Sequence, residues 1–357
     1  MRKRCHDIWR RFLSPLERDA GKGKEMEERI YLLPKEGDFY KANMHCHTTV
    51  SDGRLTPEQI KEEYEKRGYQ IVAYTDLGMY CPHPELTTKD FLALAGFEAE
   101  LKENFLNGEQ TAGGSSSMIF YDSGPDEGQE EKTEIYRLEA GKHDRSYINS
   151  YIKKMNQLGF LATNSHPYRS MEGYEEYTGL EGLFAMEIYH YRREIEGLNG
   201  YIPQAYDEML RKGKKIYCMA SDGNRNEHPM GHPFCDSFGG FIKIKTKELT
   251  YPAVMKALKQ GDFYSSMGPE IHSLYIEGRD LVVKTGPVEK IYVKTEGRNR
   301  HIKAAPFGET LEAARFPLTG REGYIRVTCR SENGLYADSN AYFLKDLPLE
   351  FNKEQEI

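Results

Sequence analysis

Short apolar runs alternate with amphipathic stretches along much of this chain, and this alternation is the feature that most restricts its fold. The run FYKANMHCH predicts a strand, TPEQIKEEYEKRG predicts a helix with Thr56 as N-cap and Pro57 in its first turn, and YQIVAYTD predicts the next strand. Further helix–strand pairs begin at Arg145, Tyr201 and Thr250. Strands that alternate with helices in this way build a parallel sheet, either open or closed into a barrel.

Polar residues at the ends of the predicted strands favour a barrel. They stand at or just beyond the C-terminal strand ends, the face that carries the active sites of such barrels: His45, His47, Asp76, His166 and Asp222. Because a strand turns alternate side chains to the same face, His45 and His47 would point at one spot. Two imidazoles that converge are suited to zinc, iron or manganese. The alternative is an ordinary pair of surface histidines at a strand end.

The texture of the sequence changes from about Glu270 onward. Apolar and polar residues alternate there between glycine-containing turns, which predicts a small antiparallel β module ending near Asp346. A segment rich in glycine, serine and acids, 107–131, is typical of a flexible excursion around one strand. The expected segments are a polar, loosely attached N-terminal arm at 1–37, a main domain at 38–269, the β module at 270–346 and a tail at 347–357.

Charge and cysteine content exclude some classes of protein. The 357 residues carry a formal net charge of -7 with both signs interspersed, which argues against a nucleic-acid groove but not against a phosphorylated small molecule. The six cysteines have no paired spacing, as expected of reduced thiols in a cytoplasmic protein. We expect no membrane partner, because the N-terminal residues lack the apolar core of a signal peptide and no run approaches a membrane span. The sequence leaves the oligomeric state open.

Six short motifs follow one another in a specific order. They are His-x-His-Thr at 45–48, Ser-Asp-Gly at 51–53, Thr-Asp at 75–76, Gly-x-Glu at 96–98, Ser-His-Pro at 165–167 and Ser-Asp-Gly at 221–223. Together they resemble the strand-end motifs of the PHP (polymerase and histidinol phosphatase) superfamily of metal-dependent hydrolases. The C-terminal β segment looks most like the stand-alone branch that includes the carbaryl hydrolases. The resemblance implies an α/β fold, namely a distorted (β/α)7 PHP barrel of the TIM-like kind followed by the small β module.

The same resemblance implies up to three divalent metals at the C-terminal face of the barrel. The residues that would surround the first ion are His45, His47, Glu98 and Asp222. Glu98 would also bridge to a second ion, held by His166 and by a histidine that the family has on the strand SSSMIFY. This chain offers only Ser116 and Ser117 on that strand.

The third metal position is the most altered of the three. Asp52 would remain, whereas Leu77 and Asn224 stand where the family has histidines. Leucine cannot donate an electron pair, and an asparagine amide is a far weaker donor than imidazole. We therefore expect one or two divalent ions, zinc, manganese or iron, per chain. Three neighbouring histidines either replace the lost ligands or are ordinary loop residues: His83, His228 and His232.

These implied ligands predict a metal-dependent hydrolase. A metal-activated water would attack a phosphoester of a small anionic substrate, and Asp222 would orient that water or take its proton. Two other functions stay open. One is hydrolysis of a carboxylic or carbamic ester or amide, and the other is a barrel that has lost catalysis and serves as a binding or regulatory scaffold.

Three residues are candidates for binding the substrate: Arg169, His190 and Asn224. Arg169 follows His166 closely and would clamp a phosphate or carboxylate, or else form a salt bridge on the rim. His190, with Glu187 and Tyr191 beside it, either lines the pocket or packs at a strand end.

Overall fold

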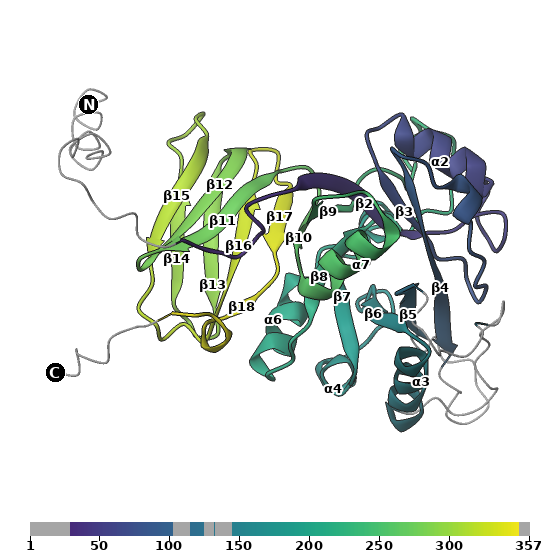
Figure 1. The fold of residues 1–357 in the computed structure, drawn as a ribbon, viewed down its shortest axis with the longest axis horizontal. Coiled ribbons are helices and arrows are strands. Elements are labelled where there is room, and N and C mark those ends of the chain that lie inside the picture. The colour runs from purple at the N-terminus through teal and green to yellow at the C-terminus, as the bar shows by residue number, and fades with distance from the viewer. Residues whose placement is uncertain (1–28, 103–114, 125–131, 133–144, 350–357) are drawn as a thin grey trace.

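The computed structural model describes residues 29–102, 115–124, 132 and 145–349. It is a mixed α/β protein with its helices gathered on one side and a group of antiparallel strands on the other (Figure 1). Parts of three predicted segments lie outside the described residues. They are 1–28 of the arm, 107–114 and 125–131 of the glycine- and serine-rich segment, and 350–357 of the tail. No helix in the described ranges is long and apolar enough to cross a membrane.

One large sheet of 14 strands runs through the molecule. Its first nine strands along the chain are β2 (Asp38–Cys46), β3 (Ile71–Tyr74), β4 (Leu92–Lys102), β5 (Ser115–Asp122), β6 (Phe160–Ser165), β7 (Leu183–His190), β8 (Tyr217–Ser221), β9 (Phe241–Thr246) and β10 (Phe263–Ser266). They pair in the order β10-β9-β2-β3-β4-β5-β6-β7-β8.

Most of these strands point the same way. Strands β2, β3 and β4 are parallel, as are β6, β7 and β8, and β5 runs antiparallel to both β4 and β6. The two parallel groups therefore share one direction, and their C-terminal ends lie at one edge. The expectation of a wholly parallel sheet is wrong for β5 and β9, which are antiparallel to both of their neighbours.

The described strands do not pair into a closed ring, so the predicted (β/α)7 barrel is not confirmed. Strand β8 ends the sheet and forms no ladder with β2. An isolated parallel bridge joins Cys46 to Asn224. The His47 N–H donates to the Asn224 carbonyl at 3.1 Å, and the Gly223 N–H donates to the His45 carbonyl at 3.0 Å. The residues that follow the end strand β8 thus contact the C-terminal end of β2 beside the histidine pair.

The four helices predicted from the sequence are confirmed: α2 (Pro57–Glu65), α3 (Arg145–Gln157), α6 (Pro203–Arg211) and α7 (Tyr251–Gln260). Thr56 caps α2 as predicted, and the Gln59 side chain accepts the Thr56 N–H in return, which forms a capping box. The remaining helical pieces are short: η1 (Pro84–Leu86), α4 (Tyr174–Thr178), α5 (Tyr191–Ile195) and η3 (Leu344–Asp346). Only η1 separates β3 from β4, so the helix-per-strand pattern of a regular barrel is incomplete.

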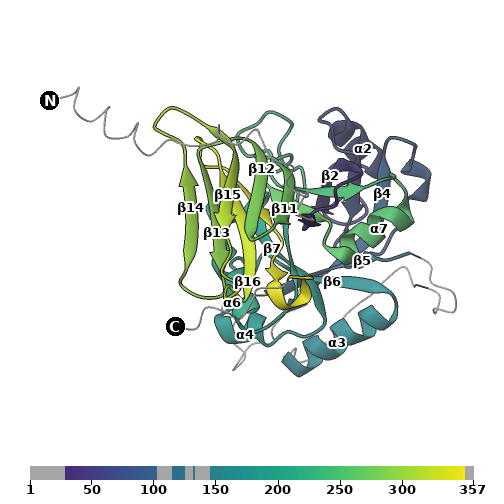
Figure 2. The same cartoon turned by 60° about the vertical axis from the view of Figure 1, so that its left-hand side comes forward.

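The C-terminal part is built from antiparallel strands. They are β11 (Ile271–Glu277), β12 (Asp280–Val288), β13 (Lys290–Thr295), β14 (Arg300–Ala304), β15 (Leu311–Pro317), β16 (Tyr324–Arg330), β17 (Tyr336–Ser339) and β18 (Tyr342–Phe343). Strands β11, β12 and β15 form a second sheet, and it shares an apolar core with β13, β16 and β17 (Figure 2). Strand β17 pairs with β10, so the large sheet passes from one part of the molecule to the other.

The N-terminal arm is attached more tightly than its sequence predicts. Strand β1 (Arg29–Tyr31) pairs with β11, and Leu32 and Leu33 are buried in the C-terminal core. The expectation of a loose arm is therefore wrong from Arg29 onward, because two adjacent leucines find a covered apolar surface. The domain boundaries drawn from the sequence stay predictions.

Candidate metal centre

His45, His47 and Glu98 bring three ligand atoms together, the two histidines from the C-terminal end of β2 and Glu98 from the part of β4 that extends beyond its pairing with β3. The Nε2 atoms of the two histidines are 3.0 Å apart, and Glu98 Oε2 lies 3.1 Å from His47 Nε2 and 3.6 Å from His45 Nε2. All three residues are buried. Ligands around a tetrahedral ion with bonds of 2.0–2.1 Å are about 3.3 Å apart, so these separations fit a metal. The pairing of β2 with β3 is irregular between Asn43 and Cys46, where a bulge re-aims side chains.

The electrostatics of this group also fit a cation. Glu98 Oε2 is buried and accepts no hydrogen bond, an unusual condition for a carboxylate. Burial by itself raises the pKa of Glu98, but His45, His166 and His47 outweigh burial and hold the pKa well below its ordinary value. Glu98 is therefore ionised. Burial likewise lowers the pKa of His45, yet Glu187 and Glu98 raise it to about 9. A metal at this point would displace the proton that His45 carries without it.

His166 adjoins this group from the end of β6. Its Nε2 lies 3.4 Å from Glu98 Oε1, the carboxylate oxygen that does not face the histidine pair. Ser117 of β5 donates a hydrogen bond to the same oxygen. Glu98 thus turns one oxygen toward the histidine pair and the other toward His166 and Ser117. Its role as a bridge between two ions stays a prediction. His166 has a positive φ of 32°, a backbone strain of the kind that clusters at functional sites.

Glu187 of β7 fixes the orientation of His45. Its Oε1 lies 3.0 Å from His45 Nδ1 and accepts the Ser221 hydroxyl. Its Oε2 accepts the Ser165 hydroxyl and, at 3.1 Å, the His166 N–H. An Nδ1–H held by a carboxylate leaves Nε2 as the metal-binding nitrogen. Glu187, His45 and His190 also form a group whose ligand atoms lie within 4.8 Å of one another. Both Glu187 oxygens are already engaged, so we assign Glu187 an orienting role.

His190 is buried behind the cluster. Its ring centroid lies 5.2 Å from that of His45 and 5.0 Å from that of His166. Its Nδ1 accepts the Arg193 N–H at 3.4 Å, which caps α5, and its Nε2 has no hydrogen-bond partner. Gly223, at φ 60°, leaves space for this ring, since a Cβ there would lie 2.1 Å from Nε2. The predicted role of His190 in substrate binding is not matched by its position, because it does not line the cavity described below.

Asp222 does not join the histidine pair as the sequence predicts. Its carboxylate accepts the N–H groups of Phe238, Gly239 and Gly240 at 2.8–2.9 Å and the Tyr64 hydroxyl at 2.8 Å. Burial raises the pKa of Asp222 to about 6 despite these hydrogen bonds. The reason for the difference is that the segment before β9 folds over the carboxylate and occupies both of its oxygens. Asp222 belongs to neither of the His/Glu groups found among the described residues.

None of the three residues at the expected third metal position belongs to a His/Cys/Asp/Glu group among the described residues. Asp52 Oδ1 lies 2.8 Å from His47 Nδ1, and Asp52 Oδ2 accepts the Arg225 Nε–H at 2.6 Å. Burial raises the pKa of Asp52, but His47 and Arg225 outweigh burial and lower it. Leu77 lines the cavity and donates nothing. Asn224 is buried away from that cavity, with its Oδ1 3.0 Å from the Tyr64 hydroxyl, so its predicted contact with substrate is not matched either.

None of the three neighbouring histidines belongs to a His/Cys/Asp/Glu group among the described residues. His83 lies 3.2 Å from Glu85, its neighbour in sequence. His228 and His232 stack on each other at 4.5 Å on an exposed loop. The interpretation as ordinary loop histidines fits these placements better than the replacement of lost ligands.

A cavity of about 430 Å³ opens onto the metal centre. Glu98, Ser117 and His166 form part of its wall. Five arginines line it, from segments that follow β2, β6, β7 and β8: Arg54, Arg169, Arg192, Arg193 and Arg225. Arg169 was predicted from the sequence and the others were not. The same signal could have found them, since each follows the C-terminal end of a strand.

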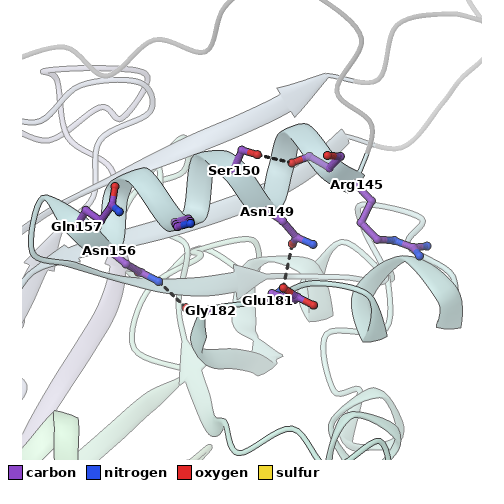
Figure 3. A pocket seen from close by; sticks show the side chains of 9 residues that line it. Arg145, Asn149, Ser150, Asn156, Gln157, Glu181 and Gly182 are labelled. Carbon is purple, nitrogen blue, oxygen red and sulfur yellow. Dashed lines mark hydrogen bonds between the residues drawn. The ribbon is translucent and has the colours of Figure 1, made fainter.

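A larger depression of about 940 Å³ runs along α3 (Figure 3). Its asparagines hold α3 to the turn before β7: Asn149 donates to the Gly179 carbonyl and Asn156 donates to the Gly182 carbonyl. Glu181 is the one carboxylate among its lining residues, which include no histidine or cysteine. This surface therefore lacks a ligand set for a metal, and the smaller cavity is the candidate site.

No protein-family model and no curated protein matches this chain. A two-domain protein from Bacteroides vulgatus, containing a predicted PHP-like metal-dependent phosphoesterase, shares 13% identity over 89% of this chain and 100% of its own, with a TM-score of 0.41. A candidate metal-dependent phosphoesterase from Bifidobacterium adolescentis shares 15% identity over 54% of this chain and 88% of its own, with a TM-score of 0.33. An amidohydrolase from Chromobacterium violaceum, with bound sulfate and no metal, shares 13% identity over 54% of this chain and 93% of its own, with a TM-score of 0.37. None of the three is described as a carbaryl hydrolase, so that part of the resemblance stays a prediction.

Proposed function

We propose that this chain is a metal-dependent hydrolase of the PHP type that cleaves a phosphoester of a small anionic molecule. The observation that carries the proposal is the separation of 3.0–3.6 Å between His45 Nε2, His47 Nε2 and Glu98 Oε2 beside an arginine-lined cavity. Nitrogen and oxygen donors of this kind suit zinc, manganese or iron. His45, His47 and Glu98 would hold one ion, and Glu98 Oε1 with His166 would take part in holding a second.

A bound divalent ion would lower the pKa of a water and polarise the phosphoryl group. The chain's own side chains supply orientation and charge. Glu187 holds the His45 ring through Nδ1 and so presents Nε2. Arg193 Nε and Arg225 Nη1 are buried donors without a hydrogen-bond partner, and both residues line the cavity. Phosphoryl oxygens are suitable acceptors for these two guanidinium groups.

The lining of the cavity favours a phosphoester over the apolar esters named as an alternative. Of its twelve lining residues, five are arginines and four are carboxylates, and Leu77 is the one aliphatic side chain. An apolar carbamate or carboxylic ester would bury little surface against such walls. The altered positions at Leu77, Ser117 and Asn224 keep the other alternative open, a scaffold without catalysis.

Metal content and a substrate panel test the proposal together. We expect the purified protein to carry one or two divalent ions per chain by elemental analysis and to hydrolyse phosphomonoesters in preference to carboxylic esters. His47→Ala should lose both bound metal and hydrolysis, whereas the matched control His232→Ala, on the exposed loop, should keep both. Stoichiometric metal without hydrolysis of any phosphoester or ester would favour the scaffold. A chain without metal affinity would contradict the proposal.

A further inference from the structure

Within the described residues, the arginines of the cavity fall into an inner layer with ion pairs, Arg192, Arg193 and Arg225, and an outer layer without them, Arg54 and Arg169. The side chains of Arg192, Arg193 and Arg225 are 11–13% exposed. Arg54 is exposed, and Arg169 is partly buried, as those three are. The inner layer lies next to the metal centre, since Arg225 Nη2 is 3.6 Å from Glu98 Oε2.

The inner arginines are already partly neutralised. Arg192 pairs with Glu196 and Glu227, Arg193 pairs with Glu196 at 2.7 Å, and Arg225 pairs with Asp52 at 2.6 Å. Three of their buried nitrogens have no hydrogen-bond partner: Arg192 Nη1, which lies 3.7 Å from Asp236 Oδ2, Arg193 Nε and Arg225 Nη1. The last two suffice for one anionic group. The reacting phosphoryl group beside Glu98 would occupy them.

The outer arginines are free of such partners. Within the described part of the chain, the guanidinium groups of Arg54 and Arg169 have no ion pair and no hydrogen bond. Arg54 is held close to the inner layer through its backbone, because its N–H donates to the Arg225 carbonyl at 2.8 Å. Arg169 follows His166 by three residues and lines the same cavity. Two unpaired guanidinium groups at one mouth are suited to an anion.

The size and polarity of the cavity indicate a substrate that is larger than a phosphoryl group and polar. About 430 Å³ lies within the range of sites for whole small molecules, so a phosphoryl group alone would leave most of it empty. The walls are almost entirely charged or polar. The part of the substrate that extends from the metal centre toward the rim is therefore polar.

We propose that the substrate is a small polar molecule with two anionic groups. One is the phosphoryl group that reacts at the metal centre against Arg193 and Arg225. The other is a second phosphate or a carboxylate that Arg54 and Arg169 bind at the rim. This inference rests on the proposed function, which it deepens by naming the class of substrate.

Three ligands of equal chain length test the inference: butyl phosphate, 1,4-butanediol bisphosphate and 4-phosphooxybutanoate. Their affinities are measured by isothermal titration calorimetry on the full-length, metal-loaded protein. We expect one or both of the ligands with two anionic groups to bind about tenfold or more tightly than butyl phosphate, because a charge-assisted hydrogen-bonded contact is gained. Which of the two binds more tightly distinguishes a phosphate from a carboxylate at the rim.

The double variant Arg54→Ala/Arg169→Ala should reduce this preference to about one, as expected when charge-assisted contacts are lost. Arg321→Ala, which removes an exposed arginine from the C-terminal part, should leave the preference unchanged. The inference is overturned if the wild-type protein binds all three ligands equally, or if its preference survives in the double variant. Turnover is measured separately. Hydrolysis of butyl phosphate without any preference for a second anionic group refutes the inference and keeps the proposed function. A preference for a second anionic group without hydrolysis refutes the proposed function alone.

Discussion

Glu187 decides which nitrogen of His45 faces the metal position. In Glu187→Gln the amide oxygen can still accept from Nδ1, but the amide NH2 group then faces the Ser165 hydroxyl and the His166 N–H. The ring of His45 is held less firmly, so we expect the affinity for Zn²⁺ or Co²⁺ to fall by roughly 10–100-fold. Competition with a chromophoric chelator measures this affinity. The matched control is Glu181→Gln on the α3 surface. If Glu187→Gln lowers the melting temperature but leaves the metal affinity unchanged, Glu187 has only a packing role.

The pKa of His45 predicts how stability and metal binding depend on pH. Its folded pKa of about 9 lies above the ordinary value of 6.5. The protonated ring therefore stabilises the metal-free fold fully below about pH 6.5, and this stabilisation is lost as the pH rises through 9. The metal needs the neutral ring, so its affinity increases over the same window. We expect the difference in melting temperature between metal-loaded and metal-free protein to widen from pH 6.5 to pH 9. A difference that stays constant or narrows would be contrary to this assignment.

At the scale of elements, the turn before β9 depends on Asp222. Its carboxylate satisfies three backbone N–H groups and the Tyr64 hydroxyl in a buried position. Asp222→Ala leaves these donors without an acceptor, which we expect to lower the free energy of unfolding by roughly 3 kcal/mol or more. Urea unfolding with and without EDTA measures the effect. Our assignment requires the same loss in both conditions, whereas a metal ligand would lose most of its contribution once EDTA removes the ion.

The predictable elements are those set by local sequence. Thr56, Pro57 and the apolar spacing that follows predict α2, and strict alternation predicts the antiparallel strands after Glu270. The direction of β5 could not be predicted, because period-two alternation is the same in parallel and antiparallel strands. Whether the sheet closes into a barrel could not be predicted either, because closure depends on whether β8 pairs with β2.

In the candidate site too, the residues that could be predicted are those set by local sequence. His45 lies on β2 and His47 directly follows its last residue, Cys46, so their convergence could be predicted from strand geometry. Glu187 gains its role from partners on β2, β6 and β8, which are brought together only by the fold. Asp222 shows the converse. Its motif predicts a ligand, but the backbone of residues 238–240, which no motif signals, takes its oxygens.

At the scale of the whole molecule, buried charges join the C-terminal strands to the α/β part. Arg326 of β16 is fully buried and donates to Asp207 of α6 at 2.6 Å and to Asp338 of β17 at 2.9 Å. Asn340 adds a second link, since it accepts the Cys218 N–H of β8 at 2.9 Å and donates to the Phe263 carbonyl of β10 at 3.0 Å. Together with the β10–β17 pairing, these contacts predict that the two parts unfold as one unit.

Arg326→Met tests this coupling. It leaves the buried carboxylate of Asp338 and the partly exposed carboxylate of Asp207 without the Arg326 cation, and breaking a buried ion pair such as Arg326–Asp338 costs about 3–5 kcal/mol. If the parts are coupled, circular dichroism, which follows the whole chain, and Co²⁺ absorbance, which follows the metal centre, should both shift to lower urea by the same amount, in one transition each. The double variant Arg326→Met/Asp207→Asn should recover part of the loss, because one of the two uncompensated charges is removed. The contrary result would be two separate transitions in the wild-type protein and a metal centre that Arg326→Met leaves unaffected. It would show that the C-terminal strands fold independently of the α/β part, even though one sheet runs through both.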